Sequence, residues 1–520
     1  MSHFISAASQ SPLNRYPAAL STAAVANHVS STTTSLRGQQ RSYVSHFYRN
    51  RVLDHYASQP VHGLTLRQLV VFGRQLTEER LLRSANYIRH EIAIRIAHRI
   101  RDFQQRLSFI VGTNPHLSEV YELYWDAFET FRRIEEIKTL DDNAKLCAML
   151  TEQLNKHMIV IPQLAIGVSE CSDLMDHSEL NKFVDEMLKM RISRRVLAEQ
   201  HLALTDQFNR ANSSSSSSSG GGGHQNIIKV REDVEQCGGM IGVIATQCRP
   251  RAVIQTCIQR CRHLFSNIYS MENTPEVIVD GHLDSHFTYI PEHLGYIITE
   301  LLKNSMQAVI RKHAPDLQLS LRGDEVSSKP PTFPPIRLTI AEGPNTLMFR
   351  VSDEGGGIDP ETLRYIWSYA DPAKKRAIAS FNEVTHLACT TSEQSDLLSR
   401  GIFLGFGLPM SRVYANYWGG ELAVQTMAGL GTDAYLQLPK LGNVVEQVGD
   451  YQLPHQHSHP AVLMKNHPST SNTGTSTGTS TATNTGSGVN HATISTASAH
   501  TYPTSNHPIP FTKHKQALVI

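Results

Sequence analysis

The stretch Glu300-Leu-Leu-Lys-Asn304, together with Asp353-Glu-Gly355-Gly356-Gly357 further along the chain, decides the fold class. Apolar residues recur at three- and four-residue spacing around the first stretch, which predicts a helix beginning at Pro291. Glu300 and Asn304 are then one turn apart on its polar side. The amide oxygen of Asn304 is a hard ligand suited to Mg²⁺, and the Glu300 carboxylate can orient or deprotonate an attacking hydroxyl.

The second stretch follows a predicted β-hairpin, formed by residues 336–340 and 347–351 around a Gly-Pro-Asn turn. Asp353 therefore stands at a strand end, where its oxygens can accept a hydrogen bond from the exocyclic amine of adenine. Gly355 and Gly357 would let the backbone pass close to the base or the phosphates. Glycine-rich turns after strands are common, so this stretch alone is weak evidence for a nucleotide site.

Two later segments strengthen the prediction. The segment Gly405-Phe-Gly407-Leu408-Pro409 precedes an apolar helical pattern, and the free N–H groups and dipole of such a helix start suit a triphosphate. The segment Gly429-Leu-Gly431-Thr432 leads into an alternating strand. Thr432 is either a hydrogen-bonding residue near the adenine or an ordinary turn threonine. The four elements in this order predict an ATP site that is not a P-loop.

This order resembles the GHKL ATPases, which include gyrase, the heat-shock-ninety chaperones, histidine kinases and mismatch-repair MutL. A narrower resemblance, over roughly residues 42–442, is to the mitochondrial branched-chain ketoacid dehydrogenase kinase and the pyruvate dehydrogenase kinases. The motifs that resemble the amino-terminal bundle of that family are Arg95-Ile-Ala-His-Arg99, Phe109-Ile-Val-Gly-Thr-Asn114-Pro, Tyr121-Glu-Leu-Tyr124 and His201-Leu-Ala-Leu204. The resemblance implies an α + α/β protein: a four-helix-type bundle, then a GHKL-type ATP-binding α/β sandwich with a mixed sheet.

Composition divides the 520 residues into domains and polar segments. Residues 1–53 contain no Asp or Glu and are rich in Arg and Ser, which is typical of a mitochondrial transit peptide. The chain from about residue 455 is rich in Ser, Thr, Asn and His and predicts disorder. We expect a disordered transit peptide (1–41), a helical bundle (42–210), a Ser/Gly linker (211–224), an ATP-binding kinase domain (225–442) and a disordered tail (443–520).

The resemblance implies an ATP-dependent serine kinase of the mitochondrial matrix that phosphorylates and inactivates the E1α subunit of a 2-oxoacid dehydrogenase complex. Glu300 would be its catalytic base, and Asn304 would hold Mg²⁺. The remaining residues expected around ATP are Asp353, Gly355, Gly357, Gly405, Gly407, Leu408 and Thr432. The family also implies a homodimer, binding of the lipoyl domain of the E2 core, and a K⁺ ion.

Tyr296, four residues before Glu300, bears on the choice of complex. The pyruvate enzymes typically carry histidine there and the branched-chain enzyme carries tyrosine, although an ordinary amphipathic-helix tyrosine fits equally well. The chain also lacks an Asp-Trp pair near the end of the catalytic domain, which the pyruvate enzymes use in dimer contacts. Both features favour the branched-chain complex over the pyruvate complex.

The sequence departs from the family in two places. The family's third glycine box usually reads GxGxGLP, whereas here the nearest extra glycine before Gly405 is Gly401. Residues 367–400 correspond to the lid over the nucleotide, and Tyr369-Ala-Asp371-Pro-Ala replaces the paired threonines expected near its start. The family's potassium and phosphate contacts are therefore not carried over to these residues.

Two alternatives from other classes stay open. A histidine kinase would need a phosphoacceptor such as His98 or His201, and a non-catalytic, nucleotide-gated scaffold would bind the complex without phosphorylating it. Net charge of +1 without a basic, aromatic-rich patch predicts no nucleic-acid partner. The chain has no apolar run of about eighteen residues, so we expect no membrane span. Seven cysteines without a CxxC motif agree with reduced thiols in the matrix.

Overall fold

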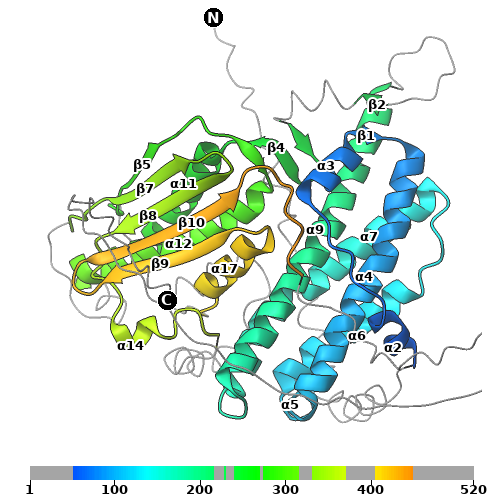
Figure 1. Ribbon diagram of the computed structural model, residues 1–520, viewed down its shortest axis with the longest axis horizontal. Coiled ribbons are helices and arrows are strands. Elements are labelled where there is room, and N and C mark those ends of the chain that lie inside the picture. The colour runs from blue at the N-terminus through cyan, green and yellow to red at the C-terminus, as the bar shows by residue number, and fades with distance from the viewer. Residues whose placement is uncertain are drawn as a thin grey trace, which may run out of the picture. The chain divides into compact units, whose positions relative to one another are not determined.

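The computed structural model describes residues 51–215, 228–229, 239–269, 273–315, 331–369 and 405–448. The expected transit peptide, most of the Ser/Gly linker and most of the tail lie outside these residues. Within them, an amino-terminal helical domain precedes a domain with a mixed sheet, as Figure 1 shows. This order confirms the predicted fold class.

Four helices of the amino-terminal domain, α3, α4, α6 and α7, begin at a residue whose side chain caps the helix. Thr77 accepts a hydrogen bond from the N–H of Arg80 (3.3 Å), and Asn114 accepts one from the N–H of Leu117 (2.9 Å), just before Pro115. The apolar stripes of these helices face one another and form a buried core. The helices are α2 (Arg51–Ala57), α3 (Leu66–Gly73), α4 (Glu78–Arg106), α5 (Ser108–Thr113), α6 (Pro115–Arg132), α7 (Leu140–Lys156), η2 (His157–Ile159), α8 (Val160–Glu170) and α9 (His177–Ser215).

Helix α9 continues to Ser215, past the expected end of the bundle at residue 210. Near its end the Ser213 hydroxyl donates to the carbonyl of Asn209 (2.8 Å), so the first serine of the predicted linker satisfies its hydroxyl within the helix. Strand β2 (Ile228–Lys229), which follows the predicted linker, pairs antiparallel with β1 (Gln75–Leu76), which follows α3. Helix α9 therefore includes residues 211–215 of the segment predicted as a linker.

The second domain is built on a five-stranded sheet with the order β5-β7-β8-β10-β9. The pair β5–β7 is parallel and the other neighbours are antiparallel, which makes the sheet mixed. A smaller sheet has the order β3-β4-β6. The strands are β3 (Met240–Ile241), β4 (Ile244–Cys248), β5 (Val277–Gly281), β6 (Phe287–Tyr289), β7 (Ile336–Glu342), β8 (Thr346–Asp353), β9 (Glu421–Met427) and β10 (Gly431–Pro439).

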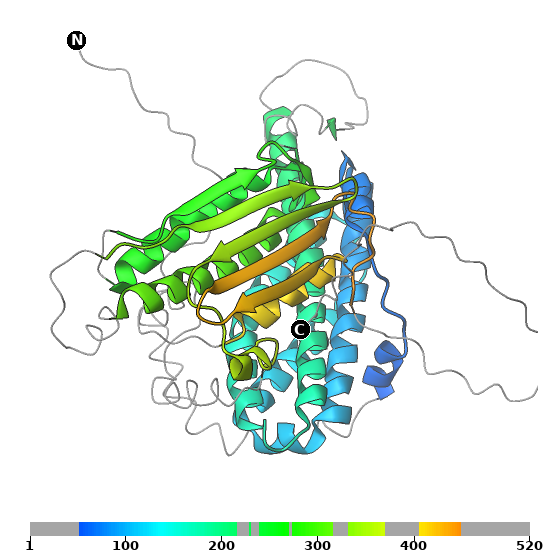
Figure 2. The same cartoon turned by 60° about the vertical axis from the view of Figure 1, so that its left-hand side comes forward.

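Helices cover one face of the large sheet (Figure 2). On β8 the residues Leu347, Phe349 and Val351 are buried against them, whereas Met348 and Arg350 are exposed on the other face. This alternation follows from the two-residue period of a strand and confirms the predicted hairpin of β7 and β8. The described helices of this domain are α11 (Pro250–Tyr269), α12 (Pro291–His313) and α17 (Gly407–Tyr417), with the short α14 (Pro360–Leu363), which buries no residue.

The described chain ends in a segment, residues 443–448, that the sequence analysis assigns to the tail. Glu446 in this segment is buried, and its carboxylate accepts hydrogen bonds from both terminal nitrogens of Arg95 (3.1 and 2.8 Å), from the N–H of Leu64 (3.1 Å) and from the Tyr417 hydroxyl. Arg95 is itself buried on α4. A carboxylate buried with so many donors is part of the folded core, so the domain extends at least to residue 448.

Within the part of the chain that the structure describes, no helix is both long enough and apolar enough to cross a bilayer.

Candidate active site

Helix α12 presents the two residues predicted to carry the chemistry. Glu300 is partly buried, and its Oε1 accepts a hydrogen bond from the Lys303 ammonium (2.8 Å). Asn304 is exposed and makes no side-chain hydrogen bond to any described residue. Its amide oxygen is therefore available, as an Mg²⁺ ligand must be. The structure places Glu300 and Asn304 one turn apart on the same helix, as the spacing predicts.

Asp353 lies at the end of β8, where three elements hold its carboxylate. The Ser305 hydroxyl of α12 donates to Oδ2 (2.8 Å), and the N–H groups of Gly355 and Thr432 donate to Oδ1 (2.9 and 3.3 Å). Burial raises the pKa of Asp353 above its ordinary value, although these hydrogen bonds oppose the shift. A carboxylate offers about four lone-pair sites, so one remains for an adenine amine.

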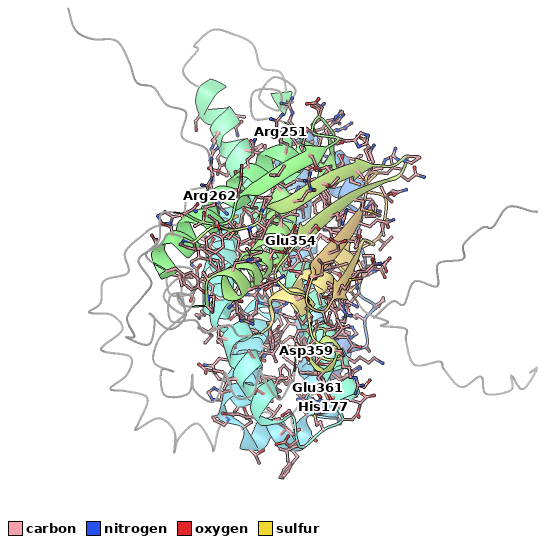
Figure 3. All side chains as sticks on the ribbon, turned by 90° about the vertical axis from the view of Figure 1, so that its left-hand side faces the viewer. His177, Arg251, Arg262, Glu354, Asp359 and Glu361 are labelled. Atoms are coloured by element: carbon pink, nitrogen blue, oxygen red, sulfur yellow. The ribbon has the colours of Figure 1, made fainter. Side chains whose placement is uncertain are left out.

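The glycines after Asp353 lie in the turn between Glu354 and Asp359 (Figure 3), where neighbouring atoms leave little room for a side chain. A Cβ on Gly355 would collide with Ala308 of α12. Gly357 has φ of +73° and packs against the carbonyl of Met427, so a side chain there would be both strained and obstructed. This lack of space explains why Gly355 and Gly357 are glycines, independently of the role that we expect for them near the nucleotide.

Lys312 is a residue of this region that the sequence analysis missed. From the last turn of α12 its ammonium donates to the carbonyls of Glu354 (3.0 Å), Gly429 (3.1 Å) and Leu430 (3.2 Å). It thereby joins the glycine turn after β8 to the turn between β9 and β10. A basic residue near a helix end is too common to have singled it out.

The first turn of α17 packs against Glu300. Gly407 is the first residue of the helix, Gly405 lies two residues earlier, and none of the described side chains caps the first turn. Pro409 has no N–H and that of Met410 donates to the Phe406 carbonyl, so the N–H groups of Gly407 and Leu408 are the ones that suit an anion such as a phosphate. A Cβ on Gly407 would collide with the Glu300 carboxylate, which places this turn directly against the predicted base. The Leu408 side chain packs toward the core, so only its backbone can serve a ligand.

Thr432 is the second residue of β10, and Tyr296 lies on α12 one turn before Glu300. The Thr432 hydroxyl is 3.2 Å from that of Thr426, and its N–H points at Asp353. The ring of Tyr296 lies 4.7 Å from that of Tyr414, centroid to centroid. Burial, and then the charge of Glu300, raise the pKa of Tyr296 well above its ordinary value, so the phenol beside the carboxylate stays neutral.

The two candidate phosphoacceptor histidines are inside the bundle. His201 is fully buried, with its ring nitrogens 3.1 Å from the Ser84 hydroxyl and 2.9 Å from the Asn143 amide oxygen. Burial lowers its pKa to about 4. His98 is also buried, and its Nε2 lies 2.8 Å from the carbonyl of Gln59. Neither ring presents a free nitrogen to a phosphoryl donor, which argues against the histidine-kinase alternative.

The remaining sequence features of the site lie outside the described residues. These are Gly401, the lid residues from 370 onward, including Asp371, and the segment where relatives are expected to bind K⁺. Among the residues that are described, no cluster of His, Cys, Asp and Glu has the composition of a metal site. A cavity of about 890 Å³ runs along α9, next to Ser368 and Glu446.

Comparison with known proteins gives matches over both domains. Residues 63–244 match the family described as mitochondrial branched-chain alpha-ketoacid dehydrogenase kinase, and residues 289–442 match the family described as histidine kinase-, DNA gyrase B- and HSP90-like ATPase.

Individual relatives extend the match over most of the chain. Mitochondrial pyruvate dehydrogenase (acetyl-transferring) kinase 2 of Saccharomyces cerevisiae is 26% identical over 471 residues, covering 78% of this chain and 87% of the relative. The mitochondrial pyruvate dehydrogenase kinase of Arabidopsis thaliana is 29% identical over 387 residues, covering 74% and 92%. Human isozyme 4 is 26% identical over 407 residues, covering 76% and 85%.

Proposed function

We propose that this chain, a relative of the mitochondrial dehydrogenase kinases within the GHKL ATPases, phosphorylates a serine of the E1α subunit of a 2-oxoacid dehydrogenase complex and so inactivates it. Its relatives are named as mitochondrial protein kinases, which supports a protein kinase of the matrix. One observation carries the catalytic part of the proposal. Glu300 on α12 lies directly against Gly407, at the uncapped start of α17, which suits a base beside a phosphate site.

The chain's own residues divide the work of an in-line transfer. ATP with Mg²⁺ supplies the phosphoryl group and much of the charge neutralisation. The first-turn N–H groups of α17 would bind phosphate oxygens, and Asp353 would accept a hydrogen bond from the adenine. Asn304 would hold the metal, while Glu300 orients the serine hydroxyl and accepts its proton. Lys303, hydrogen-bonded to Glu300, keeps that carboxylate in place.

We favour the branched-chain complex over the pyruvate complex as the target. Tyr296 beside Glu300 and the match of residues 63–244 to the branched-chain kinase family support this choice. The names of the relatives quoted above point the other way, to pyruvate dehydrogenase. The proposal includes a homodimer and docking of the bundle to the lipoyl domain of the E2 core, as in the family that the sequence resembles.

Transfer of labelled γ-phosphate from ATP by the full chain tests the proposal. Purified branched-chain E1 and pyruvate E1 are offered in parallel, each with its lipoyl core. Acid-stable label on branched-chain E1α is the expected result, and label on pyruvate E1α alone would correct the choice of complex. Label on neither, with ATP still bound, would contradict the kinase proposal and favour the scaffold alternative.

A further inference from the structure

Two aromatic residues that are far apart in the sequence meet beside the candidate active site. Tyr369 is the last described residue before segment 370–404, and Phe406 stands just after that segment. Their ring centroids are 4.8 Å apart with an interplanar angle of 66°. Both side chains are buried. The described residues on either side of segment 370–404 therefore meet at one aromatic contact.

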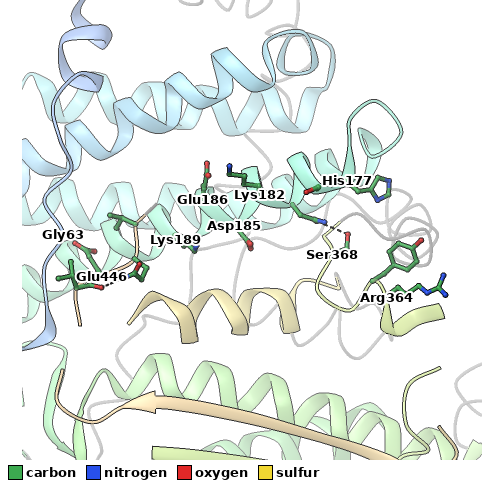
Figure 4. Close-up of a pocket in the computed structure, with 15 residues that line it drawn as sticks. Gly63, His177, Lys182, Asp185, Glu186, Lys189, Arg364, Ser368 and Glu446 are labelled. Atoms are coloured by element: carbon green, nitrogen blue, oxygen red, sulfur yellow. Dashed lines mark hydrogen bonds between the residues drawn. The ribbon is translucent and has the colours of Figure 1, made fainter. Parts of the chain in front are cut away.

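Tyr369 is also attached to the helical bundle. Its hydroxyl donates to Oδ1 of Asp185 on α9 (2.6 Å), and its N–H donates to the Asn181 side-chain oxygen (2.9 Å). The hydroxyl of Ser368 donates to the same Asn181 oxygen (3.2 Å). Figure 4 shows Asp185 on the side of α9 that faces α17, and Ser368 approaching α9. A single turn of α9 therefore holds the chain at residues 368–369.

Phe406 connects Tyr369 with the residues that pack against Glu300, the predicted base. It directly precedes Gly407, the glycine that packs against the Glu300 carboxylate, and it is the cap position of α17. A second contact supports the first: the Arg412 guanidinium of α17 lies 4.5 Å from the ring centroid of Trp367. Contacts run without a gap from α9 through Tyr369 and Phe406 to the start of α17.

We propose that Tyr369 is a positioning residue, which sets the first turn of α17 against Glu300 by holding Phe406 while it is itself held by Asp185 of the bundle. The phosphate-binding role of that turn rests on the proposed function. If Tyr369 fixes the turn, nucleotide affinity depends on the position of α9. By linkage, bound nucleotide then restrains α9 to the same extent.

The two partners of the hydrogen bond can be changed one at a time in the full chain. Tyr369→Phe removes the hydroxyl and keeps the ring, and Asp185→Leu removes the acceptor at a partly exposed position. Asp185→Asn keeps an oxygen acceptor for the phenol. Tyr435→Phe is the matched control, because the Tyr435 hydroxyl also donates to an aspartate (Asp433, 3.1 Å) but lies on β10 with no contact to α9.

Affinity for MgADP, measured by isothermal titration calorimetry, is the main readout, and the unfolding temperature without nucleotide is the second. Tyr369→Phe and Asp185→Leu should each weaken MgADP binding about three- to tenfold, the range of one hydrogen bond. The double variant should bind MgADP no more weakly than the single variant with the lower affinity, because both substitutions remove the same hydrogen bond. Asp185→Asn and Tyr435→Phe should bind MgADP like the parent.

The inference is overturned if Tyr369→Phe and Asp185→Leu bind MgADP with the parent's affinity, whether or not their unfolding temperature falls, because the contact would then be only structural. Effects of the two variants that add would overturn it as well. If Tyr369→Phe does not fold, Asp185→Leu and Asp185→Asn decide alone. A parent that binds MgADP but labels neither E1 refutes the proposed substrate, while the affinities still decide the role of Tyr369.

Discussion

Among the contacts between the bundle and the ATP-binding domain, two are unlike each other. At Glu446 a buried carboxylate meets the buried guanidinium of Arg95, with Glu91 and Tyr417 alongside. At Tyr369 a single phenol meets Asp185 at the border of a cavity. Breaking a buried ion pair is costly, because it leaves a charge without compensation, whereas losing one hydrogen bond to a partly exposed group is mild. The contact at Glu446 therefore suits a permanent attachment of the two domains, and the contact at Tyr369 suits one that can break and form again.

The largest effect is expected for a substitution that impairs catalysis but leaves both contacts between the domains unchanged. Glu300→Gln should lower phosphoryl transfer about a hundred- to ten-thousandfold, because a positioned base is lost, while both contacts remain intact. MgADP affinity and the urea midpoint should match those of the parent. The initial rate of γ-phosphate transfer to E1 measures the effect. Transfer at the parent rate would show that Glu300 is not the base.

The Glu446 contact should dominate stability. Glu446→Ala leaves the buried Arg95 with Glu91 as its one ionic partner among the described residues, and we expect a loss of about 3–5 kcal/mol in the free energy of unfolding in urea. The matched control is Glu79→Ala, which breaks an exposed ion pair to Arg83 and should cost less than about 1 kcal/mol. Equal losses in the two variants would contradict the assignment of Glu446 to the core.

Acid should weaken both domains through buried neutral histidines. Burial lowers the pKa of His201 in the bundle to about 4 and that of His293 in the ATP-binding domain to about 3. Unfolded histidine takes up a proton near pH 6.5, so below that pH the unfolded chain binds more protons and stability falls as pH falls. Between pH 6.5 and 5 each histidine should cost about 2 kcal/mol.

Urea midpoints measured from pH 7 to pH 5 test this dependence. The curve for His201→Gln should be flatter than that for the parent. A variant whose midpoint falls as steeply as the parent's would mean that His201 is protonated in the folded chain.

The smallest effect is expected at Lys312. Lys312→Gln should weaken MgADP binding about two- to fivefold, because three carbonyls around the glycine turn lose a charged donor at an exposed position. Lys145→Gln on α7, which removes an equally exposed charge from the bundle, is the control and should bind MgADP like the parent. Equal behaviour of the two variants would show that the turn keeps its shape without Lys312.

Local pattern was enough to locate α12, the β7–β8 hairpin and the start of α17, because each depends on spacing within a few residues. That is why the positions of Glu300, Asn304, Asp353 and Gly407 in the fold could be predicted, while their roles stay predictions. Glu446 was missed because its partner Arg95 is 351 residues away and nothing beside it signals burial. The contact of Tyr369 with Asp185 spans 184 residues and escaped for the same reason. Contacts between residues that are far apart in the chain leave no periodic pattern in the sequence from which they could be predicted.

The carboxylate of Glu446 also makes the bundle depend on how far synthesis has proceeded. Arg95 is made early, but the oxygens that satisfy it belong to a segment made almost at the end of the described chain. A product that stops at residue 442 would hold an under-compensated guanidinium in its first domain, and such defects expose a chain to chaperones and proteases. The core of the first domain is therefore complete only after the ATP-binding domain has been made, because Glu446 follows the last described strand of that domain.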